Sequence, residues 1–83
     1  YAVHIPLKAP ADLVKKYPGK LTPGQQSNPL YAAMIESLDN SVGRVVKKLD
    51  TLGLSERTVI VFTSDNGGLA TLEGPNTPAT SNP

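Results

Sequence analysis

The sequence predicts an α/β fold that contains one βαβ unit. Three segments support this prediction: a strand end over residues 1–5, an amphipathic helix over residues 29–52, and an apolar strand over residues 58–64. The two strands of such a unit run parallel, with the helix in the connection between them. Because one helix and two strands leave most of a sheet uncovered, we expect the 83 residues to be a fragment of a larger, mostly parallel sheet sandwiched by helices.

The N-terminal part is predicted to be a strand end followed by a long ordered loop. Pro6 ends the strand because proline donates no ladder hydrogen bond. Residues 6–27 are rich in proline and glycine, and residues 12–17 are expected to form one helical turn within them. This loop also carries irregularly spaced lysines, which are typical of a solvated face rather than of an anion-binding cluster: Lys8, Lys15, Lys16 and Lys20.

The helix over residues 29–52 is predicted from apolar residues that recur at spacings of three and four and so share one face: Leu30, Met34, Leu38, Val42, Val45, Leu49 and Leu52. Asn28 is expected to cap its N-terminus, with Pro29 at the first helical position. Gly53 is expected to end it in a left-handed conformation. Gly43 costs about 1 kcal/mol relative to alanine inside a helix, and close packing against another element would explain its presence.

The strand over residues 58–64 is short, β-branched and apolar on both faces. An antiparallel strand with one exposed face would alternate between apolar and polar residues, whereas a parallel strand covered by helices on both sides would not. Residues 65–83 are rich in glycine, proline, threonine and asparagine and show no periodicity, so they are predicted to form a loop.

Composition excludes several classes of function. Hydrophobic residues make up 39% and charged residues 18% of the chain, an ordinary balance for a folded protein. The net charge of +1, without a basic patch, gives no basis for expecting a nucleic-acid partner. No apolar run approaches the roughly 20 residues that span a membrane, so no membrane partner is expected. The absence of cysteine excludes a disulfide, a thiolate metal site and a cysteine nucleophile within these residues.

Polar residues follow both predicted strands. His4 lies at the end of the first, and Asp65 and Asn66 follow the second. Because ligands of α/β sheets bind beyond the carboxyl ends of parallel strands, we expect these side chains to converge at one edge. Asp65 and Asn66 supply hard oxygen donors, which suit Ca²⁺ or Mg²⁺. His4 could donate a proton to a leaving oxygen.

Each of these clusters also has a structural interpretation. Residues 65–68 are typical of a tight turn, since asparagine and glycine tolerate positive φ. A single histidine such as His4 is commonly a hydrogen-bonded structural group. Ser64 lacks the surrounding glycines of a nucleophile elbow, and the glycines match no nucleotide-binding pattern, so neither a serine hydrolase nor a nucleotide site is expected.

A family resemblance favours the chemical interpretation. Residues 31–44, residues 52–54 and residues 59–68 resemble the sulfatases of the alkaline phosphatase superfamily, and residues 2–10 resemble the histidine–proline segment found upstream in that family. The similarity covers nearly the whole stretch from Ala2 to Gly68, in the same order. It implies an alkaline phosphatase-like fold and a sulfuric ester hydrolase that acts on aryl or carbohydrate sulfates.

The same resemblance implies roles for individual residues. Asp65 and Asn66 would bind a divalent cation, usually Ca²⁺, and His4 would contact the sulfate ester near its bridging oxygen. The nucleophile of the family is a hydrated formylglycine, expected in a part of the protein N-terminal to this chain, and the cation would hold it and stabilise charge on the sulfuryl oxygens. Asn66 favours a sulfatase over related phosphodiesterases and phosphonate hydrolases, which tend to have histidine there.

The resemblance also identifies what the 83 residues lack. They contain neither a C/S-x-P-x-R motif for the formylglycine nor an N-terminal acidic pair for the other cation ligands. We therefore expect an internal fragment of a several-fold longer sulfatase that is inactive alone; export to the periplasm, the lysosome or the cell exterior is an expectation from the family only. The alternative is a non-catalytic module that self-associates through a bare sheet face and edges.

Overall fold

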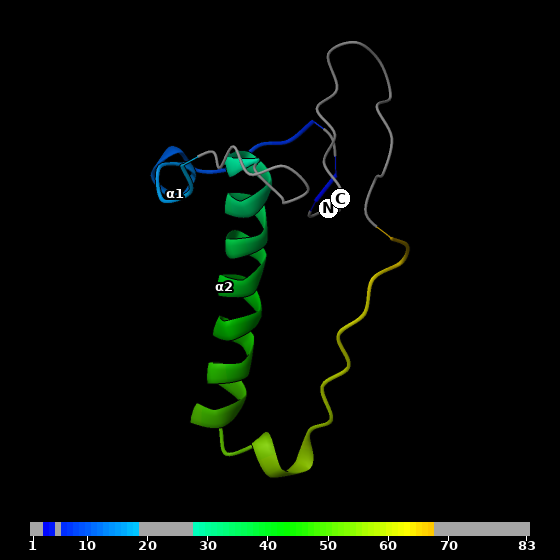
Figure 1. Ribbon diagram of the computed structural model, residues 1–83. Helices are drawn as coiled ribbons and strands as arrows, with labels where there is room; N and C mark the ends of the chain where they lie inside the picture. Colours follow the sequence, from blue (N-terminus) through cyan, green and yellow to red (C-terminus); the bar gives the residue numbers. More distant parts are fainter. Residues whose placement is uncertain (1–2, 5, 19–27, 68–83) are drawn as a thin grey trace.

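The computed structural model describes residues 3–4, 6–18 and 28–67 and is dominated by one long helix (Figure 1). The helix α2 spans Pro29–Thr51, one residue less at its C-terminal end than the periodicity predicts. A short helix, α1, spans Ala11–Val14, and a 3₁₀ turn, η1, spans Ser55–Arg57. The predicted loops over residues 6–27 and 65–83 lie partly outside the described residues.

The N-terminus of α2 is capped as the sequence predicts. Asn28 has an extended backbone, and its side-chain Oδ1 accepts hydrogen bonds from the backbone N–H of Leu30 at 3.0 Å and of Tyr31 at 3.2 Å. These bonds satisfy two of the donors that a helix leaves without an internal partner, and Pro29 has no N–H to satisfy. The cap therefore fixes the start of α2 at Pro29.

The C-terminus of α2 ends at a glycine in a left-handed conformation. Gly53 has a φ of 65° and is the one described residue with a positive φ. Its N–H donates to Asp50 O at 2.9 Å, and the N–H of Leu54 donates to Leu49 O at 2.9 Å. This pair of bonds is the Schellman motif, which confirms the predicted stop and turns the chain away from the helix axis.

Among the described residues, nothing packs closely against Gly43. A Cβ atom built on Gly43 meets no atom within 4 Å, so the helix surface is open at this position. The expected packing partner of Gly43 therefore stays a prediction, and no described residue offsets the cost of a helical glycine.

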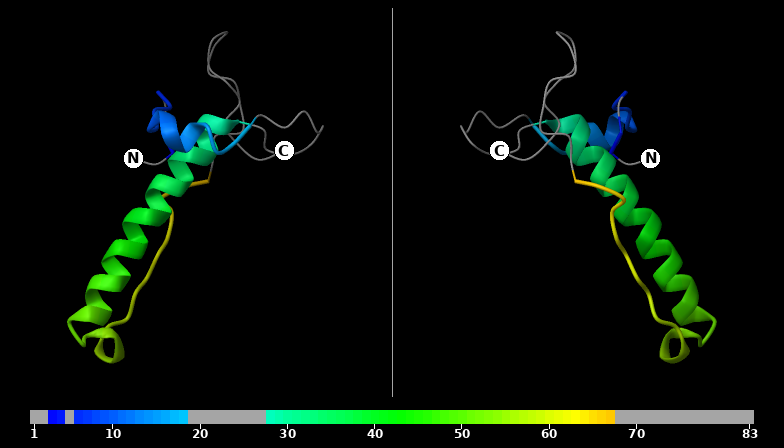
Figure 2. Two further views of the ribbon diagram at one scale, coloured as in Figure 1. Left: turned by 90° about the vertical axis from the view of Figure 1, so that its left-hand side faces the viewer. Right: turned by 90° about the vertical axis from the view of Figure 1, so that its right-hand side faces the viewer.

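The segment over residues 58–64 is extended and returns along α2, in the direction opposite to the helix (Figures 1 and 2). A strand is defined by ladder hydrogen bonds to a neighbour, and the described residues offer this segment no partner. No strand is therefore present in the described part of the chain. In the N-terminal segment, Val3 lies in a turn and His4 has no regular structure, so the βαβ arrangement is not confirmed.

The short helix α1 packs against α2 and is followed by a tight turn. The turn places the N–H of Lys16 on Leu13 O and the N–H of Tyr17 on Val14 O, each at 3.1 Å. This one helical turn begins a residue before the predicted range of 12–17. Figure 1 shows α1 beside the N-terminal end of α2, the part of the helix that contains the fully buried Ala33.

Little apolar surface is buried elsewhere. The chain exposes 6820 Å² of accessible surface, whereas a compact monomer of its mass exposes about 4,700 Å². Its radius of gyration is 15.7 Å, compared with roughly 12 Å for a compact domain of this length. Among the described residues, Ala33 is the one hydrophobic residue that is fully buried.

Candidate functional site

The predicted site residues lie on segments that approach the same half of α2. The N-terminal segment, which carries His4, lies beside the N-terminal end of the helix, and the extended segment reaches residues 65–67 alongside the N-terminal half (Figures 1 and 2). His4, Asp65 and Asn66 are all exposed. Both segments thus lie toward the N-terminal half of α2, and the sheet edge expected to align the two clusters is not formed by the described residues.

Asp65 and Asn66 form a local bend with its own hydrogen bonds. Asp65 Oδ1 accepts from the N–H of Asn66 at 3.0 Å, and Asn66 Nδ2 donates to Gly67 O at 2.8 Å. The hydroxyl of Ser64 donates to Asn66 O. Residues 65 and 66 form a bend without a backbone turn hydrogen bond, and none of residues 65–67 has the positive φ expected of a tight turn. Among the described residues, no donor binds Asp65 Oδ2 or Asn66 Oδ1.

The oxygen atoms of this bend are of the type that a hard cation binds, but there are too few of them to form a complete site. One carboxylate oxygen and one amide oxygen are the ligand types that Ca²⁺ and Mg²⁺ prefer, while Ca²⁺ takes six to eight oxygen ligands. Within residues 3–4, 6–18 and 28–67, no group of three or more acidic, histidine or cysteine side chains could hold a metal ion. The remaining ligands of any such site would have to come from other residues.

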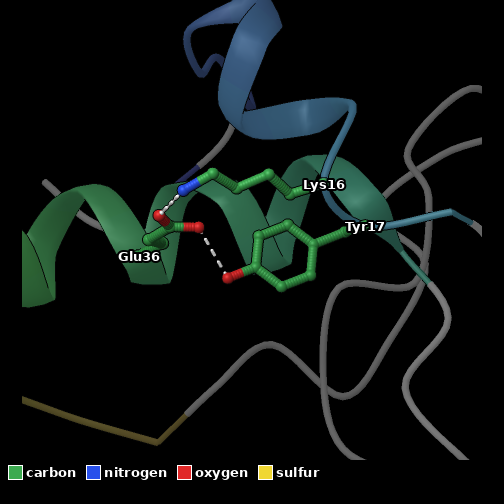
Figure 3. A network of polar contacts seen from close by, with 3 residues as sticks. All are labelled: Lys16, Tyr17 and Glu36. Atoms are coloured by element: carbon green, nitrogen blue, oxygen red, sulfur yellow. Dashed lines mark hydrogen bonds and ion pairs between the residues drawn. The ribbon is translucent and has the colours of Figure 1, made fainter.

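A polar cluster that the sequence did not predict joins the loop after α1 to α2 (Figure 3). Lys16 Nζ lies 2.5 Å from Glu36 Oε1, and the hydroxyl of Tyr17 donates to Glu36 Oε2 at 2.7 Å. Both oxygens of one carboxylate are thus used by neighbouring residues of the loop. We call these three residues the Glu36 clamp.

The Glu36 clamp shifts the acid–base behaviour of all three side chains. Hydrogen bonds from Lys16 and then Tyr17 lower the pKa of Glu36 below its usual value. The hydrogen bond and the charge of Glu36 raise the pKa of Lys16, and the hydrogen bond to Glu36, aided by partial burial, raises the pKa of Tyr17. The clamp is therefore held as a carboxylate, an ammonium and a neutral phenol across the neutral pH range.

The clamp corrects the interpretation of Lys16 as part of a purely solvated face. The Lys16 side chain is 58% exposed, but its ammonium is paired with a carboxylate that is only 19% exposed. Twenty residues separate the two partners in the sequence, and nothing in the local pattern of either segment indicates the pairing. Lys8 and Lys15 are exposed, in agreement with a solvated face, and Lys20 lies outside the described residues.

No helix in the described ranges has the length and apolar character needed to cross a membrane.

Comparison with known proteins assigns the family. The family model described as Sulfatase matches residues 1–80, so the chain belongs to the sulfatase family. It is 35% identical over 77 residues to arylsulfatase J of Mus musculus, covering 93% of this chain and 12% of that protein. It is also 38% identical over 78 residues to a sulfatase of Formosa agariphila, covering 82% of this chain and 14% of that protein.

Other relatives match over shorter stretches. The steryl-sulfatase of Rattus norvegicus is 40% identical over 53 residues, which cover 64% of this chain and 9% of that protein. No solved structure gives a significant match. The chain therefore spans about one eighth of the length of the first two relatives, and the family assignment rests on sequence.

Proposed function

We propose that the chain is part of the catalytic domain of a sulfuric ester hydrolase that cleaves sulfate monoesters. The observation that carries the proposal is the extent of the family match, which runs through residues 1–80 and so includes both polar clusters. Relatives named as arylsulfatase and steryl-sulfatase share 35% and 40% identity with it, which favours a sulfate ester as the substrate class.

Asp65 and Asn66 are the residues that would bind the divalent cation, with Ca²⁺ as the expected ion and Mg²⁺ as the alternative. The proposal is supported by the two oxygen atoms, Asp65 Oδ2 and Asn66 Oδ1, that no hydrogen bond within the bend uses. When bound, the cation would supply Lewis-acid stabilisation of negative charge on the sulfuryl oxygens. The formylglycine nucleophile and the other cation ligands would come from residues outside this chain.

His4 is proposed to protonate the leaving alcohol oxygen. An imidazole is suited to this role because its ring N–H can donate a hydrogen bond to the bridging oxygen and pass the proton to a developing alkoxide. The exposure of His4, which leaves its imidazole accessible to a substrate, supports this assignment.

The 83 residues alone are expected to be inactive. Two cation ligands fill only part of a shell of six to eight, and the chain contains no C/S-x-P-x-R motif whose cysteine or serine could be converted to formylglycine. The isolated chain should therefore bind Ca²⁺ more weakly than micromolar, as measured by calorimetry; micromolar binding would contradict the proposed division of the site.

The competing assignment is a phosphodiesterase or phosphonate hydrolase of the same superfamily. The amide of Asn66 favours a hard cation over Zn²⁺ or Mn²⁺, which imidazole binds better. The deciding experiment assays the full-length protein that contains this segment on a panel of aryl and carbohydrate sulfates and on an aryl phosphodiester. We expect turnover of at least one sulfate ester; turnover of the phosphodiester with none of any sulfate would overturn the assignment.

A further inference from the structure

The Glu36 clamp fastens the loop after α1 to α2 at two points (Figure 3). Glu36 Oε1 pairs with the ammonium of Lys16 at 2.5 Å, and Glu36 Oε2 accepts a hydrogen bond from the hydroxyl of Tyr17 at 2.7 Å. Because the two contacts use the two oxygens of one planar carboxylate, they restrict the rotation of the loop on the helix as well as its distance from it. Both partners of each contact lie in this chain, so the clamp does not depend on which surfaces a longer protein covers.

Residues 10–17 form a hydrogen-bonded unit that the clamp holds at its C-terminal end. The N–H of Val14 donates to Pro10 O at 3.1 Å, and the N–H of Tyr17 donates to Val14 O at 3.1 Å. The helix α1 lies within this unit and packs against the N-terminal half of α2 (Figure 1). The clamp and this packing together hold the unit on the helix, so loss of the clamp would allow the unit to shift or rotate.

His4 is joined to this unit by a short stretch that contains two prolines. Pro6 and Pro10 have fixed φ angles, and Pro10 has a φ of −55° and a ψ of 136°, close to the extended polyproline conformation. Six residues in such a conformation span at most roughly 19 Å, so a rotation of the unit by about 5° would move the far end of the stretch by roughly 1.7 Å. A displacement at the clamp would therefore be transmitted to His4.

We propose that the Glu36 clamp positions His4 for catalysis, with Glu36 as the positioning residue. The inference rests on the proposed role of His4 as proton donor to the leaving oxygen. Proton transfer is sensitive to displacements of about 1 Å, because the donor and the acceptor must lie within hydrogen-bond distance of each other. Loss of the clamp should therefore slow the reactions whose leaving group needs a proton and leave other reactions nearly unchanged.

Kinetics of the full-length protein that contains this segment test the catalytic consequence. Tyr17→Phe and Glu36→Gln should each lower kcat for an alkyl sulfate about three- to tenfold, the effect of one or two hydrogen bonds. The same variants should change kcat for a nitrophenyl sulfate, which leaves without a proton, by less than about twofold. Equal losses for both substrates would indicate less folded enzyme rather than a displaced imidazole and would overturn the inference.

The same substitution in a His4→Ala background shows whether the clamp acts through the imidazole. Without the proton donor, Glu36→Gln should have no further effect on the ratio of alkyl to nitrophenyl sulfate turnover, because both substitutions remove the same contribution. A further loss as large as that in the parent would overturn the inference. If His4→Ala alone shows no dependence on the leaving group, the proposed function of His4 fails, and amide exchange then decides whether the clamp holds the segment.

Amide exchange of the full-length protein, followed by mass spectrometry, measures how firmly the segment is held. Exchange in the peptide that contains His4 should be about three- to tenfold faster in Glu36→Gln and in Lys16→Met than in the parent. Lys16→Arg keeps the positive charge and should exchange like the parent. Lys15→Met, at the adjacent exposed lysine, is the matched control and should equal the parent in exchange and turnover. Unchanged exchange in Glu36→Gln would overturn the inference, whatever reaction the protein catalyses.

Discussion

The two halves of α2 differ in how much of their apolar surface is covered by other described residues. At the N-terminal half, α1 packs against the helix, Ala33 is fully buried, and the Glu36 clamp ties the loop to the helix through two hydrogen bonds. At the C-terminal half, Val45 is 61% and Leu52 55% exposed, and the returning segment over residues 58–64 is exposed along its length. The C-terminal half of α2 contacts η1 but leaves these apolar side chains more than half exposed.

An apolar segment is therefore not necessarily a buried one within this chain. The segment over residues 58–64 is the most hydrophobic stretch of the chain, yet it contributes no fully buried residue. The region around the Glu36 clamp is more polar and makes the contacts between elements.

The largest effect is expected for Asp65→Ala in the full-length protein that contains this segment. Loss of a cation ligand removes several kcal/mol of transition-state stabilisation, so kcat/KM should fall by roughly a thousandfold or more, with a weaker cation affinity. Asp50→Ala, at an exposed position of α2, is the matched control and should leave both nearly unchanged. Equal behaviour of the two variants in a sulfate-release assay with Ca²⁺ titration would remove Asp65 from the site.

A smaller and more selective effect is expected for His4→Ala in the same protein. General acid catalysis contributes about 10²- to 10⁴-fold, and mainly where the leaving group needs a proton. Turnover of alkyl or carbohydrate sulfates should therefore fall much more than turnover of a nitrophenyl sulfate. Equal slowing for good and poor leaving groups would contradict the proton-donating role.

The third prediction concerns the open C-terminal half of α2. Gly43→Ala should raise the stability of the isolated chain by about 1 kcal/mol, because no atom lies within 4 Å of the added Cβ and alanine favours the helix. Thermal unfolding followed by circular dichroism measures this change. The same substitution in the full-length protein sharpens the contrast: a loss of stability there would show that another element packs against this position.

The smallest effect is expected from the Glu36 clamp, because surface ion pairs contribute little. The pKa of Glu36 is lowered, so the stabilisation is present above its unfolded value near 4.5 and is lost as the pH falls through the lower folded pKa. The pKa values of Lys16 and Tyr17 are raised, so their part is present below about 10 and is lost at higher pH.

Amide hydrogen exchange near α1 measures how much the Glu36 clamp stabilises the packing of α1 against α2. Exchange should be slowest between these two limits in the parent chain and nearly independent of acid pH, after correction for intrinsic rates, in Glu36→Gln. Glu56→Gln, at an exposed position in η1, is the control and should keep the acid dependence near α1. If exchange in Glu36→Gln keeps the acid pH dependence of the parent chain, that dependence arises from a group other than Glu36.

The features that could be predicted from the sequence are those that depend on residues close together along the chain. The Asn28 cap and the left-handed Gly53 depend on residues within one turn of each helix end, and both are confirmed. The Lys16–Glu36 pair could not be predicted, because it depends on how a loop folds back over twenty residues. The strand over residues 58–64 depends on a neighbouring strand, so its composition alone does not form it.

The site predictions follow the same division. Asp65 and Asn66 could be singled out because hard oxygen donors follow an apolar run, and the structure shows how their bend is held. Their role as ligands stays a prediction, since it requires donors from other parts of the protein. His4 was singled out as the only histidine of the chain, and its role as proton donor is likewise a prediction.

Because the chain reverses direction at Gly53, the length of α2 determines how close Asp65 comes to the start of the helix. The 23 residues of the helix rise about 1.5 Å each, or roughly 35 Å, and residues 58–65 return at about 3.3 Å each, or roughly 26 Å. The returning segment thus carries Asp65 about three quarters of the way back along the helix. Removing one turn from α2 would displace Asp65 by about 5.4 Å relative to the N-terminal segment, more than the length of a metal–ligand bond.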